Sequence, residues 1–280
     1  MVKDILANKW EVGASHYAKG STAVNENLWK EILEDIYLAD KKLEVLDVGT
    51  GPGVVAIILA ELGHNVTGLD LSQSMLDIAK DIATQRGIHC NFVRGDAEAL
   101  PFDNESFDLV TNRLNLWTLP NPGKGVYHWV RVLKPGGKLA VFVNDVKNPY
   151  EQTKELKNED SKQQHIFSKE YYDTFQHLPF ARALPSQVKA LLEAAGLRDV
   201  TVKPIKDERR YTVEQLIDFL RTKNVDESKI TSLLDNKLNE ELLQETFESL
   251  NLVDTLFKKL DSGQEFAIVR HMVGVIGVKG

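Results

Sequence analysis

The stretch Leu46-Asp47-Val48-Gly49-Thr50-Gly51-Pro52-Gly53 decides the fold that we expect for this chain. It closes an apolar run that begins at Leu43 and is typical of a buried strand, and it contains three alternating glycines. Apolar residues then recur at helical spacing over residues 54–62, and Gly63 follows as a helix cap. The pattern predicts a strand, a tight turn and a helix. Open α/β sheets bind ligands at the carboxyl end of such a strand.

The spacing of the glycines separates two kinds of ligand. A dinucleotide site has the form Gly-x-Gly-x-x-Gly, in which a helix N-terminus holds a diphosphate. This chain has Gly-x-Gly-x-Gly, preceded by the acidic Asp47. A carboxylate beside the turn suits a cationic group better than a diphosphate. S-adenosylmethionine, which carries a sulfonium and an ammonium group and no phosphate, fits this pattern, although glycine-rich strand ends also occur as purely structural turns.

The next predicted strand, residues 65–70, ends in Asp70. This carboxylate follows the glycines by roughly 20 residues, a position from which it can accept hydrogen bonds from both hydroxyls of a ribose. Leu71 comes directly afterwards and can lie against the face of an adenine ring. Ser72 is predicted to cap the following helix, whose first turn contains Met75.

Two more strand ends carry polar groups. Residues 91–94 lead to Asp96, whose carboxylate can accept the exocyclic amine of adenine, and to Ala97, whose N–H can serve a ring nitrogen. Residues 107–111 lead to Arg113. The remaining predicted elements of this half are a helix and a strand, at residues 126–132 and 138–143.

Taken together, residues 43–145 resemble a class I S-adenosylmethionine-dependent methyltransferase, and they are most similar to small-molecule enzymes of the ubiquinone and menaquinone biosynthesis type. Several motifs occur in the order and at the intervals of that family. The matching segments are residues 47–53, 68–70, 72–76, 95–102, 106–110 and 131–137. The resemblance weakens before residue 43 and over residues 146–264.

The resemblance implies a Rossmann-like, doubly wound α/β sheet of seven strands. Its last strand, near residues 265–278, would be antiparallel, and insertions would form a mostly helical cap. The resemblance also implies S-adenosylmethionine as the cofactor and S-adenosylhomocysteine as the product. The implied cofactor-binding residues are Tyr17, Asp47, Gly49, Thr50, Gly51, Asp70, Leu71, Met75, Asp96, Ala97 and Arg113.

The resemblance implies a role for several of these residues, and for Arg113 and Met75 it leaves a second role open. Gly49 and Gly51 would lie under the methionine part of the cofactor, with Asp47 near its amino group. Arg113 would form the floor of the sulfonium region, or its side chain would make an ordinary ion pair. Met75 would contact the cofactor, or would belong to the core of its helix.

The N-terminal segment holds the two candidates for a role in catalysis. In related methyltransferases a similarly placed tyrosine closes over the cofactor as part of a lid, which makes Tyr17 a candidate, with Gly13 and Gly20 as hinges. His16 is a possible general base, or else a solvent-facing loop histidine. A base is needed only when the acceptor must lose a proton, and no residue stands out as that base. No metal site is expected.

The chain divides into six predicted segments. Three belong to the core, and three supply the lid and the cap. In chain order they are an N-terminal lid and helix segment (1–40), the cofactor-binding core (41–145), a cap insertion (146–184), a core helix and strand (185–208), a helical cap insertion (209–263) and the final core strand (264–280).

Several local patterns are predicted outside the binding core. Residues 25–38 form an amphipathic helix, and residues 151–164 form a charged, mobile loop. The aromatic residues of 167–180 either pack against the lid helices or form a wall of an apolar acceptor pocket. Residues 212–215 have a capping-box pattern, and apolar residues over 243–260 recur at steps of three and four, which predicts one helix face.

The composition argues for a small organic acceptor. The 280 residues carry a net charge of −7, so no broad basic field favours nucleic acid. The single cysteine, Cys90, excludes a disulfide framework within the chain, and neither a signal-like N-terminus nor a membrane-length apolar run occurs. We expect a cytoplasmic monomer or homodimer that acts without nucleic acid or membrane. The alternatives are a non-catalytic S-adenosylmethionine-binding protein and an NAD(P)-dependent oxidoreductase.

Overall fold

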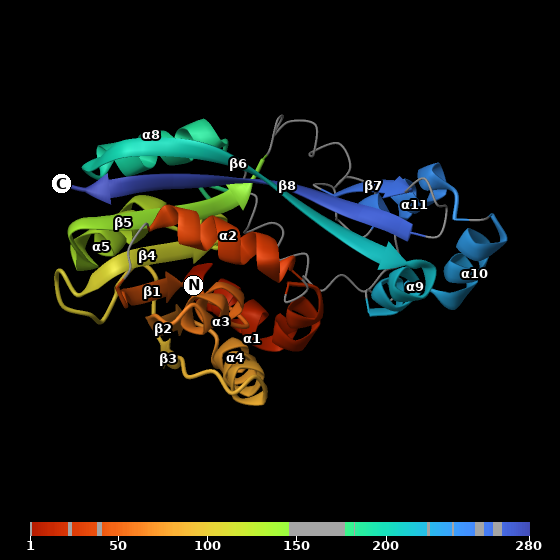
Figure 1. Ribbon diagram of the computed structural model, residues 1–280, viewed down its shortest axis with the longest axis horizontal. Helices are drawn as coiled ribbons and strands as arrows, with labels where there is room; N and C mark the ends of the chain where they lie inside the picture. Colours follow the sequence, from red (N-terminus) through yellow and green to blue (C-terminus); the bar gives the residue numbers. More distant parts are fainter. Residues whose placement is uncertain are drawn as a thin grey trace.

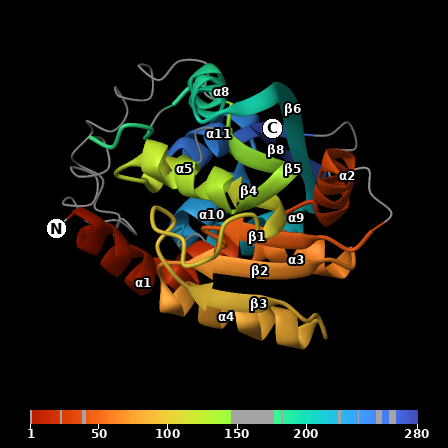
Figure 2. The ribbon, with the colours of Figure 1, turned by 90° about the vertical axis from the view of Figure 1, so that its left-hand side faces the viewer.

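The computed structural model describes residues 2–21, 24–37, 41–145, 177–181, 183–222, 225–236, 238–249, 255–259 and 265–280. In these residues one mixed β-sheet forms the centre, and helices cover both of its faces (Figure 1 and Figure 2). Helices α2 (Glu26–Ile36) and α3 (Val54–Glu61) pack on one face, and α5 (Pro122–Val132) and α8 (Pro185–Ala194) lie on the other. This is the doubly wound α/β arrangement that the sequence predicts.

The strand order in the sheet is β3-β2-β1-β4-β5-β8-β6. The first five strands of the chain pair in parallel, and the order reverses between β1 and β4. Their bounds are β1 (Glu44–Val48), β2 (Asn65–Asp70), β3 (Asn91–Arg94), β4 (Phe107–Arg113) and β5 (Leu133–Asn144). Sheets of this kind bind ligands at the carboxyl edge, where the strand order reverses.

The last strand, β8 (Glu265–Lys279), lies between β5 and β6 (Leu197–Thr212) and is antiparallel to both. This pairing confirms the predicted seven-strand sheet with an antiparallel final strand. An additional strand, β7 (Thr255–Lys259), pairs with β8 outside that order.

The presence of β7 shows that the predicted helix face over residues 243–260 is wrong at its C-terminal end. Helix α11 (Glu240–Ser249) covers the first part of that range, and β7 covers residues 255–259. The N–H and C=O groups at the free edge of β8 favour pairing with a further strand. The spacing of apolar residues within one segment carries no information about such a distant partner. Residues 250–254 lie outside the described part of the chain.

Strands β6 and β8 continue beyond the end of β5 as a two-stranded ribbon. The last residue of β5, Asn144, pairs with Met272, so residues 265–271 of β8 and 206–212 of β6 extend past it. The sequence predicts only residues 199–203 as this strand. Since β5 is parallel to β1, the ribbon leaves the sheet at its carboxyl edge.

The ribbon carries a small helical lobe, which consists of α9 (Val213–Thr222), α10 (Glu227–Asp235), α11 and β7 (Figure 1). Its buried apolar residues form a cluster of their own, separate from those of the main sheet. Phe266 of β8 belongs to the lobe cluster, whereas Met272 of the same strand belongs to a cluster of the main sheet. A single long strand therefore joins two cores.

Two predicted helices begin with side-chain caps, of which only the second was predicted. The Asn25 Oδ1 atom accepts from Leu28 N at 3.2 Å, and α2 begins at the next residue. At the start of α9, Gln215 N donates to Thr212 Oγ1 at 3.3 Å while Thr212 N donates to Gln215 Oε1 at 3.0 Å. These reciprocal bonds are the predicted capping box.

The N-terminal segment is a helix rather than a hinged loop. Helix α1 (Val2–Ser21) runs through both Gly13 and Gly20, and it packs against α4 (Gln73–Gln85). A glycine costs a helix about 1 kcal/mol relative to alanine. Burial of Leu6 and Ala14 on the same helix offsets that cost.

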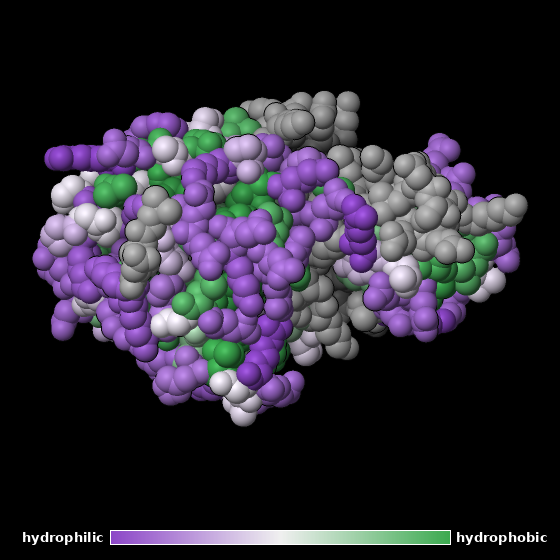
Figure 3. Space-filling view, in the orientation of Figure 1, coloured by the Kyte–Doolittle hydropathy of each residue, from purple (hydrophilic) through white to green (hydrophobic). Residues whose placement is uncertain are grey.

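The apolar residues lie mainly inside these two parts of the molecule. On the face seen in Figure 3, hydrophilic residues predominate and apolar residues appear in scattered groups. Among the helices of the described ranges, none combines the length and the apolar character that crossing a bilayer requires.

Candidate active site

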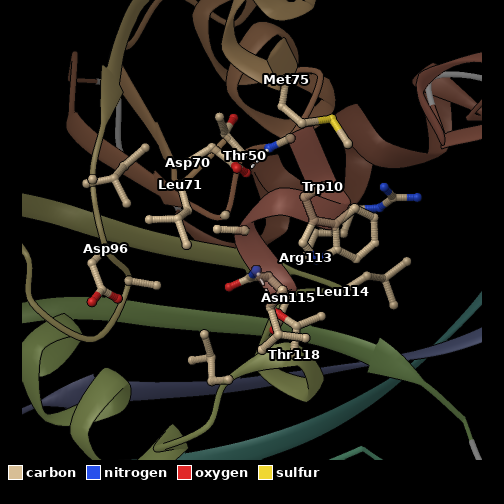
Figure 4. A pocket seen from close by; sticks show the side chains of 18 of the residues that line it. Trp10, Thr50, Asp70, Leu71, Met75, Asp96, Arg113, Leu114, Asn115 and Thr118 are labelled. Atoms are coloured by element: carbon tan, nitrogen blue, oxygen red, sulfur yellow. Dashed lines mark hydrogen bonds between the residues drawn. The ribbon is translucent and has the colours of Figure 1, made fainter. Parts of the chain in front are cut away.

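A pocket of about 980 Å³, including its open mouth, lies at the carboxyl edge of the sheet under α1. In Figure 4, Asp96 and Trp10 lie on opposite sides of this pocket. All eleven residues that the sequence predicts for the cofactor line it. Further lining residues, which the sequence analysis does not single out, are Lys3, Trp10, Glu98, Leu114 and Asn115.

The turn after β1 requires glycine. Gly49 has a φ of 68°, in the left-handed region, and a Cβ atom there would lie 2.3 Å from Asn115 Cγ. The N–H groups of Gly49 and Thr50 both donate to Leu69 O, at 2.8 and 3.0 Å. The loop is thereby tied to β2, and its backbone forms one wall of the pocket.

Asp47 is a buried carboxylate at the end of β1. Only 2% of the residue is exposed, and its Oδ1 accepts from Thr111 Oγ1 at 2.7 Å. Burial raises the pKa of Asp47 to about 6, although the Thr111 hydrogen bond and the positive charge of Arg113 act to lower it. An ionised carboxylate in this position favours a cationic ligand group.

The Arg113 side chain lies over an aromatic ring that the sequence analysis does not single out. Its guanidinium carbon is 5.0 Å from the ring centre of Trp29, which is fully buried on α2. The Trp29 ring in turn packs edge-on against Phe142 at 5.0 Å. A cation over an aromatic face is favourable, so Trp29 of α2 helps to hold Arg113 in the lining of the pocket.

Asp70 is fixed by the backbone at both of its oxygens. Gly51 N donates to Oδ2 at 2.8 Å, and Ser72 N donates to Oδ1 at 2.9 Å. Burial raises the pKa of Asp70, and the hydrogen bonds from Ser72 and Gly51 oppose that effect. Beside it, Met75 is only 2% exposed and yet lines the pocket, so it is both core and pocket wall.

Asp96 contacts α1 directly. Lys3 Nζ donates to Asp96 Oδ2 at 2.7 Å, and Glu98 N donates to Oδ1 at 2.8 Å. Burial acts to raise the pKa of Asp96, but these two hydrogen bonds and the positive charges of Lys3 and Lys124 together hold the pKa below its ordinary value. Trp129 Nε1 donates to Ala97 O at 2.9 Å, which fixes the backbone next to the carboxylate.

Aromatic residues gather where α1 faces the short 3-10 helix η1 (Leu116–Thr118). The Trp10 ring lies 5.1 Å from that of Tyr17 and 6.3 Å from that of Trp117, both edge-on. Of the two catalytic candidates, Tyr17 therefore lines the pocket, whereas the His16 side chain lies outside the described part of the chain.

The predicted aromatic wall is described only at its end. Phe180 packs against the main core, and Leu178 packs against Leu6 of α1. The other aromatic residues of 167–180 and the charged loop 151–164 lie outside the described residues. Across the described ranges, no three His, Cys, Asp or Glu side chains are grouped in a way that could hold a metal ion.

The chemistry of the pocket defines a class of ligand. Asp47, Asp70 and Asp96 line it, and Lys3 is already bound to Asp96 and to a further carboxylate, Glu98. A diphosphate would face these negative charges, whereas a nucleoside that bears a sulfonium and an ammonium group would be attracted by them. The fold and the site together define an α/β protein that binds a cationic nucleoside cofactor.

Comparison with known proteins gives the family. Residues 46–141 match the family described as "Methyltransferase domain". The chain is 31% identical to the ubiquinone biosynthesis O-methyltransferase of Coxiella burnetii over 202 residues, 70% of this chain and 82% of that protein. It is 30% identical to a sterol 4-C-methyltransferase of Caenorhabditis elegans over 174 residues, 61% of this chain and 48% of that protein.

A solved structure shares the fold. The phosphoethanolamine N-methyltransferase 2 of Haemonchus contortus, in complex with S-adenosyl-L-methionine, aligns with 100% of this chain and 60% of its own, with a TM-score of 0.62 and 20% identity. The chain belongs to the S-adenosylmethionine-dependent methyltransferases. It is an enzyme that methylates a small molecule with this cofactor, which confirms the predicted activity over the oxidoreductase alternative.

The glycine turn gives a direct test of the pocket. In Gly49→Ala, the new Cβ would meet Asn115 and the left-handed backbone would be strained. We expect a loss of stability of about 1–3 kcal/mol and at least about a tenfold loss of affinity for S-adenosylhomocysteine. Gly136→Ala is the matched control, because Gly136 has a φ of 75° with no atom near the new Cβ. Gly136→Ala should lose stability but keep its affinity for S-adenosylhomocysteine. Equal affinity losses in both variants, measured by calorimetry, would contradict the assignment.

Proposed function

We propose that the chain methylates a small acceptor of apolar or aromatic character, bound beside Trp10, Tyr17 and Trp117. The observation that carries this proposal is that Trp10 and Tyr17 line the pocket, with the Trp10 ring edge-on to both Tyr17 and the neighbouring Trp117. Such rings offer apolar area and suit the edges and faces of a flat acceptor. The names of the relatives, which include quinone and sterol methyltransferases, support a ring-containing acceptor.

Several residues are proposed to hold the cofactor. Asp47 faces the ammonium group, the loop at Gly49 and Gly51 supports the methionine part, and Arg113 lies near the sulfonium region. Asp70 accepts the ribose hydroxyls, and Asp96 accepts the adenine amine. The support is that all of these residues line one pocket and that its acidic groups are held in place by hydrogen bonds.

The protein then contributes mainly alignment and exclusion of water. When bound, S-adenosylmethionine supplies an electrophilic methyl group on a sulfur that is already a good leaving group. Alignment of acceptor and methyl group converts an encounter in solution into a reaction within one complex. Helix α1, with Trp10 and Tyr17, covers the pocket and limits access of water. Tyr17 is proposed as a positioning residue, and no residue is assigned as a base.

The cell context is also part of the proposal. We propose a cytoplasmic enzyme, a monomer or homodimer, that acts without nucleic acid. The net charge of −7 supports this, because phosphate backbones bind basic surfaces. The methylated atom is not fixed by the family, because its members include O-, C- and N-methyltransferases.

Turnover with labelled cofactor tests the acceptor class. The purified enzyme should transfer labelled methyl from S-adenosylmethionine to at least one of a catechol, a hydroquinone and a sterol, and not to tRNA or duplex DNA. Trp10→Ala should raise KM for that acceptor by about tenfold, the loss of one aromatic contact, with less effect on cofactor affinity. Transfer to nucleic acid alone would contradict the proposal, and so would an unchanged KM.

Removal of the Asp70 carboxylate tests the ribose assignment. Asp70→Ala loses a charged acceptor for two hydroxyls, so affinity for S-adenosylhomocysteine should fall about 10–100-fold. Calorimetry measures the change, and the exposed Asp77 on α4 gives the matched control Asp77→Ala, which should bind as the wild type does. NAD should bind neither variant nor the wild type. A folded Asp70→Ala protein with wild-type affinity would remove Asp70 from the site.

The raised pKa of Asp47 predicts a pH dependence. An ammonium group binds the ionised carboxylate, so affinity for S-adenosylhomocysteine should fall as the pH drops through about 6, toward tenfold per pH unit. Asp47→Asn should bind more weakly at neutral pH and lose most of this slope. For folding of the ligand-free protein the sign is opposite. Because the pKa in the folded protein exceeds 3.8, the ordinary value of an aspartate, the stability contribution of Asp47 is lost as pH rises through about 6. Equal slopes in wild type and variant would exclude Asp47 as the ammonium partner.

A further inference from the structure

Helix α1 is connected to both carboxylates that are proposed to bind the adenosine of the cofactor. Near its N-terminus, Lys3 Nζ donates to Asp96 Oδ2 at 2.7 Å. Two turns later, Glu11 Oε2 accepts from Ser72 Oγ at 2.8 Å, and the N–H of Ser72 donates to Asp70 at 2.9 Å. One helix thus reaches the adenine carboxylate directly and the ribose carboxylate through one serine.

The contact at Lys3 is held by a buried charge. Lys3 Nζ lies 2.6 Å from Glu98 Oε2, and the Glu98 side chain is only 1% exposed. The other oxygen of Glu98 accepts from Asn121 N at 2.6 Å. A buried carboxylate without a cation is strongly unfavourable, so Lys3 is fixed where it also reaches Asp96. Asp96 itself is 32% exposed, and its side chain has room to turn away when Lys3 is removed.

The contact at Glu11 is held by the start of a helix. Glu11 Oε1 accepts from Ser74 N at 3.1 Å and from Ser74 Oγ at 2.7 Å. Ser72 caps α4, because its Oγ accepts from Met75 N at 3.2 Å. A carboxylate is favourable beside these free N–H groups and the positive end of the helix dipole. Glu11 therefore fixes Ser72, and the backbone of Ser72 fixes Asp70.

Both nucleoside carboxylates keep free acceptor capacity. An ionised carboxylate offers about four lone-pair sites. Asp96 accepts from Lys3 and from Glu98 N, and Asp70 accepts from Gly51 N and Ser72 N, with a further backbone contact from Leu71. Each carboxylate is held through both of its oxygens, so its orientation is fixed. Lone pairs remain on each carboxylate to accept hydrogen bonds from further donors.

We propose that Lys3 and Glu11 are positioning residues for nucleoside recognition: Lys3 orients Asp96 toward the adenine amine, and Glu11 orients Asp70, through Ser72, toward the ribose hydroxyls. The proposal rests on the proposed roles of Asp70 and Asp96. It assigns to α1 a part in the selectivity for the cofactor, in addition to covering the pocket. The two contacts act on different ends of the nucleoside, which makes them separable.

Three ligands and four variants test this separation. The ligands are S-adenosylhomocysteine, its hypoxanthine analogue, which lacks the exocyclic amine, and its 2′-deoxy analogue. The variants are Lys3→Met, Glu11→Gln, Lys3→Arg, which keeps the cation, and Val12→Ala, a control on the face of α1 where Val12 is 73% exposed. Calorimetry gives the dissociation constants, and circular dichroism and thermal unfolding show that each variant is folded.

The wild type should bind each analogue about tenfold or more weakly than the parent ligand. Lys3→Met should reduce the preference for adenine over hypoxanthine by about fivefold and keep the preference for the 2′-hydroxyl. Glu11→Gln should show the reverse, since an amide accepts less strongly than a carboxylate. Lys3→Arg should keep most of the adenine preference, and Val12→Ala should match the wild type.

Other outcomes overturn the inference in distinguishable ways. If α1 has a purely structural role, the variants bind all three ligands more weakly by the same factor, and both preferences stay unchanged. That result overturns the positioning roles of Lys3 and Glu11 and leaves the proposed function standing. A preference that rises in Lys3→Met shows that Lys3 competes with adenine, which also overturns it. A wild type that does not discriminate between the ligands overturns the roles of Asp70 and Asp96 in the proposed function as well.

Discussion

Three partly or fully buried carboxylates at one pocket are the constraint on which the rest of the site depends. Parallel pairing of β1, β2 and β3 brings Asp47, Asp70 and Asp96 to one edge, and burial raises the pKa of Asp47 and of Asp70. Each carboxylate is balanced differently, Asp47 by a hydroxyl, Asp70 by backbone N–H groups and Asp96 by a lysine. What remains is a negative potential at fixed positions, which attracts a cationic cofactor and repels a diphosphate.

The architecture separates this site from a helical lobe that has a core of its own. The cofactor pocket is built on the parallel half of the sheet, whereas the lobe stands on the β6–β8 ribbon with its own buried cluster around Leu220, Leu233 and Phe266. Because the ribbon leaves the sheet at the carboxyl edge, the lobe lies beyond that edge (Figure 1), which is also the edge that carries the pocket residues Asp47 and Asp70. A change inside the lobe core therefore leaves the carboxylates where the main core holds them.

Sequence patterns predicted the features that depend on residues close together in the chain. The strand ends at Asp47, Asp70 and Asp96 were predictable, because a strand, a glycine turn and a helix are coded within about a dozen residues and parallel sheets share an edge. In the sequence, each of the two residues Lys3 and Glu11 looks like an ordinary surface charge. The contacts of Lys3 and Glu11 could not be predicted, because their partners lie 93 and more than 60 residues away along the chain. The same holds for Trp29 under Arg113, and for β7, whose pairing with β8 overrides its helical spacing.

The two polar contacts of α1 also bear on how cofactor binding and docking of this helix are coupled. An individual hydrogen bond is worth about 1 kcal/mol net, so each of these contacts contributes modestly to the docking of the helix. A nucleoside that binds Asp70 and Asp96 acts on the same groups that Lys3 and Glu11 contact, directly or through Ser72. Coupling between two binding events is reciprocal. If the nucleoside binds these carboxylates as proposed, any free energy that it adds to the docking of α1 is matched by an equal gain in the affinity of the docked protein for the nucleoside. In that proposal the N-terminal helix is part of the binding site as well as a cover over it.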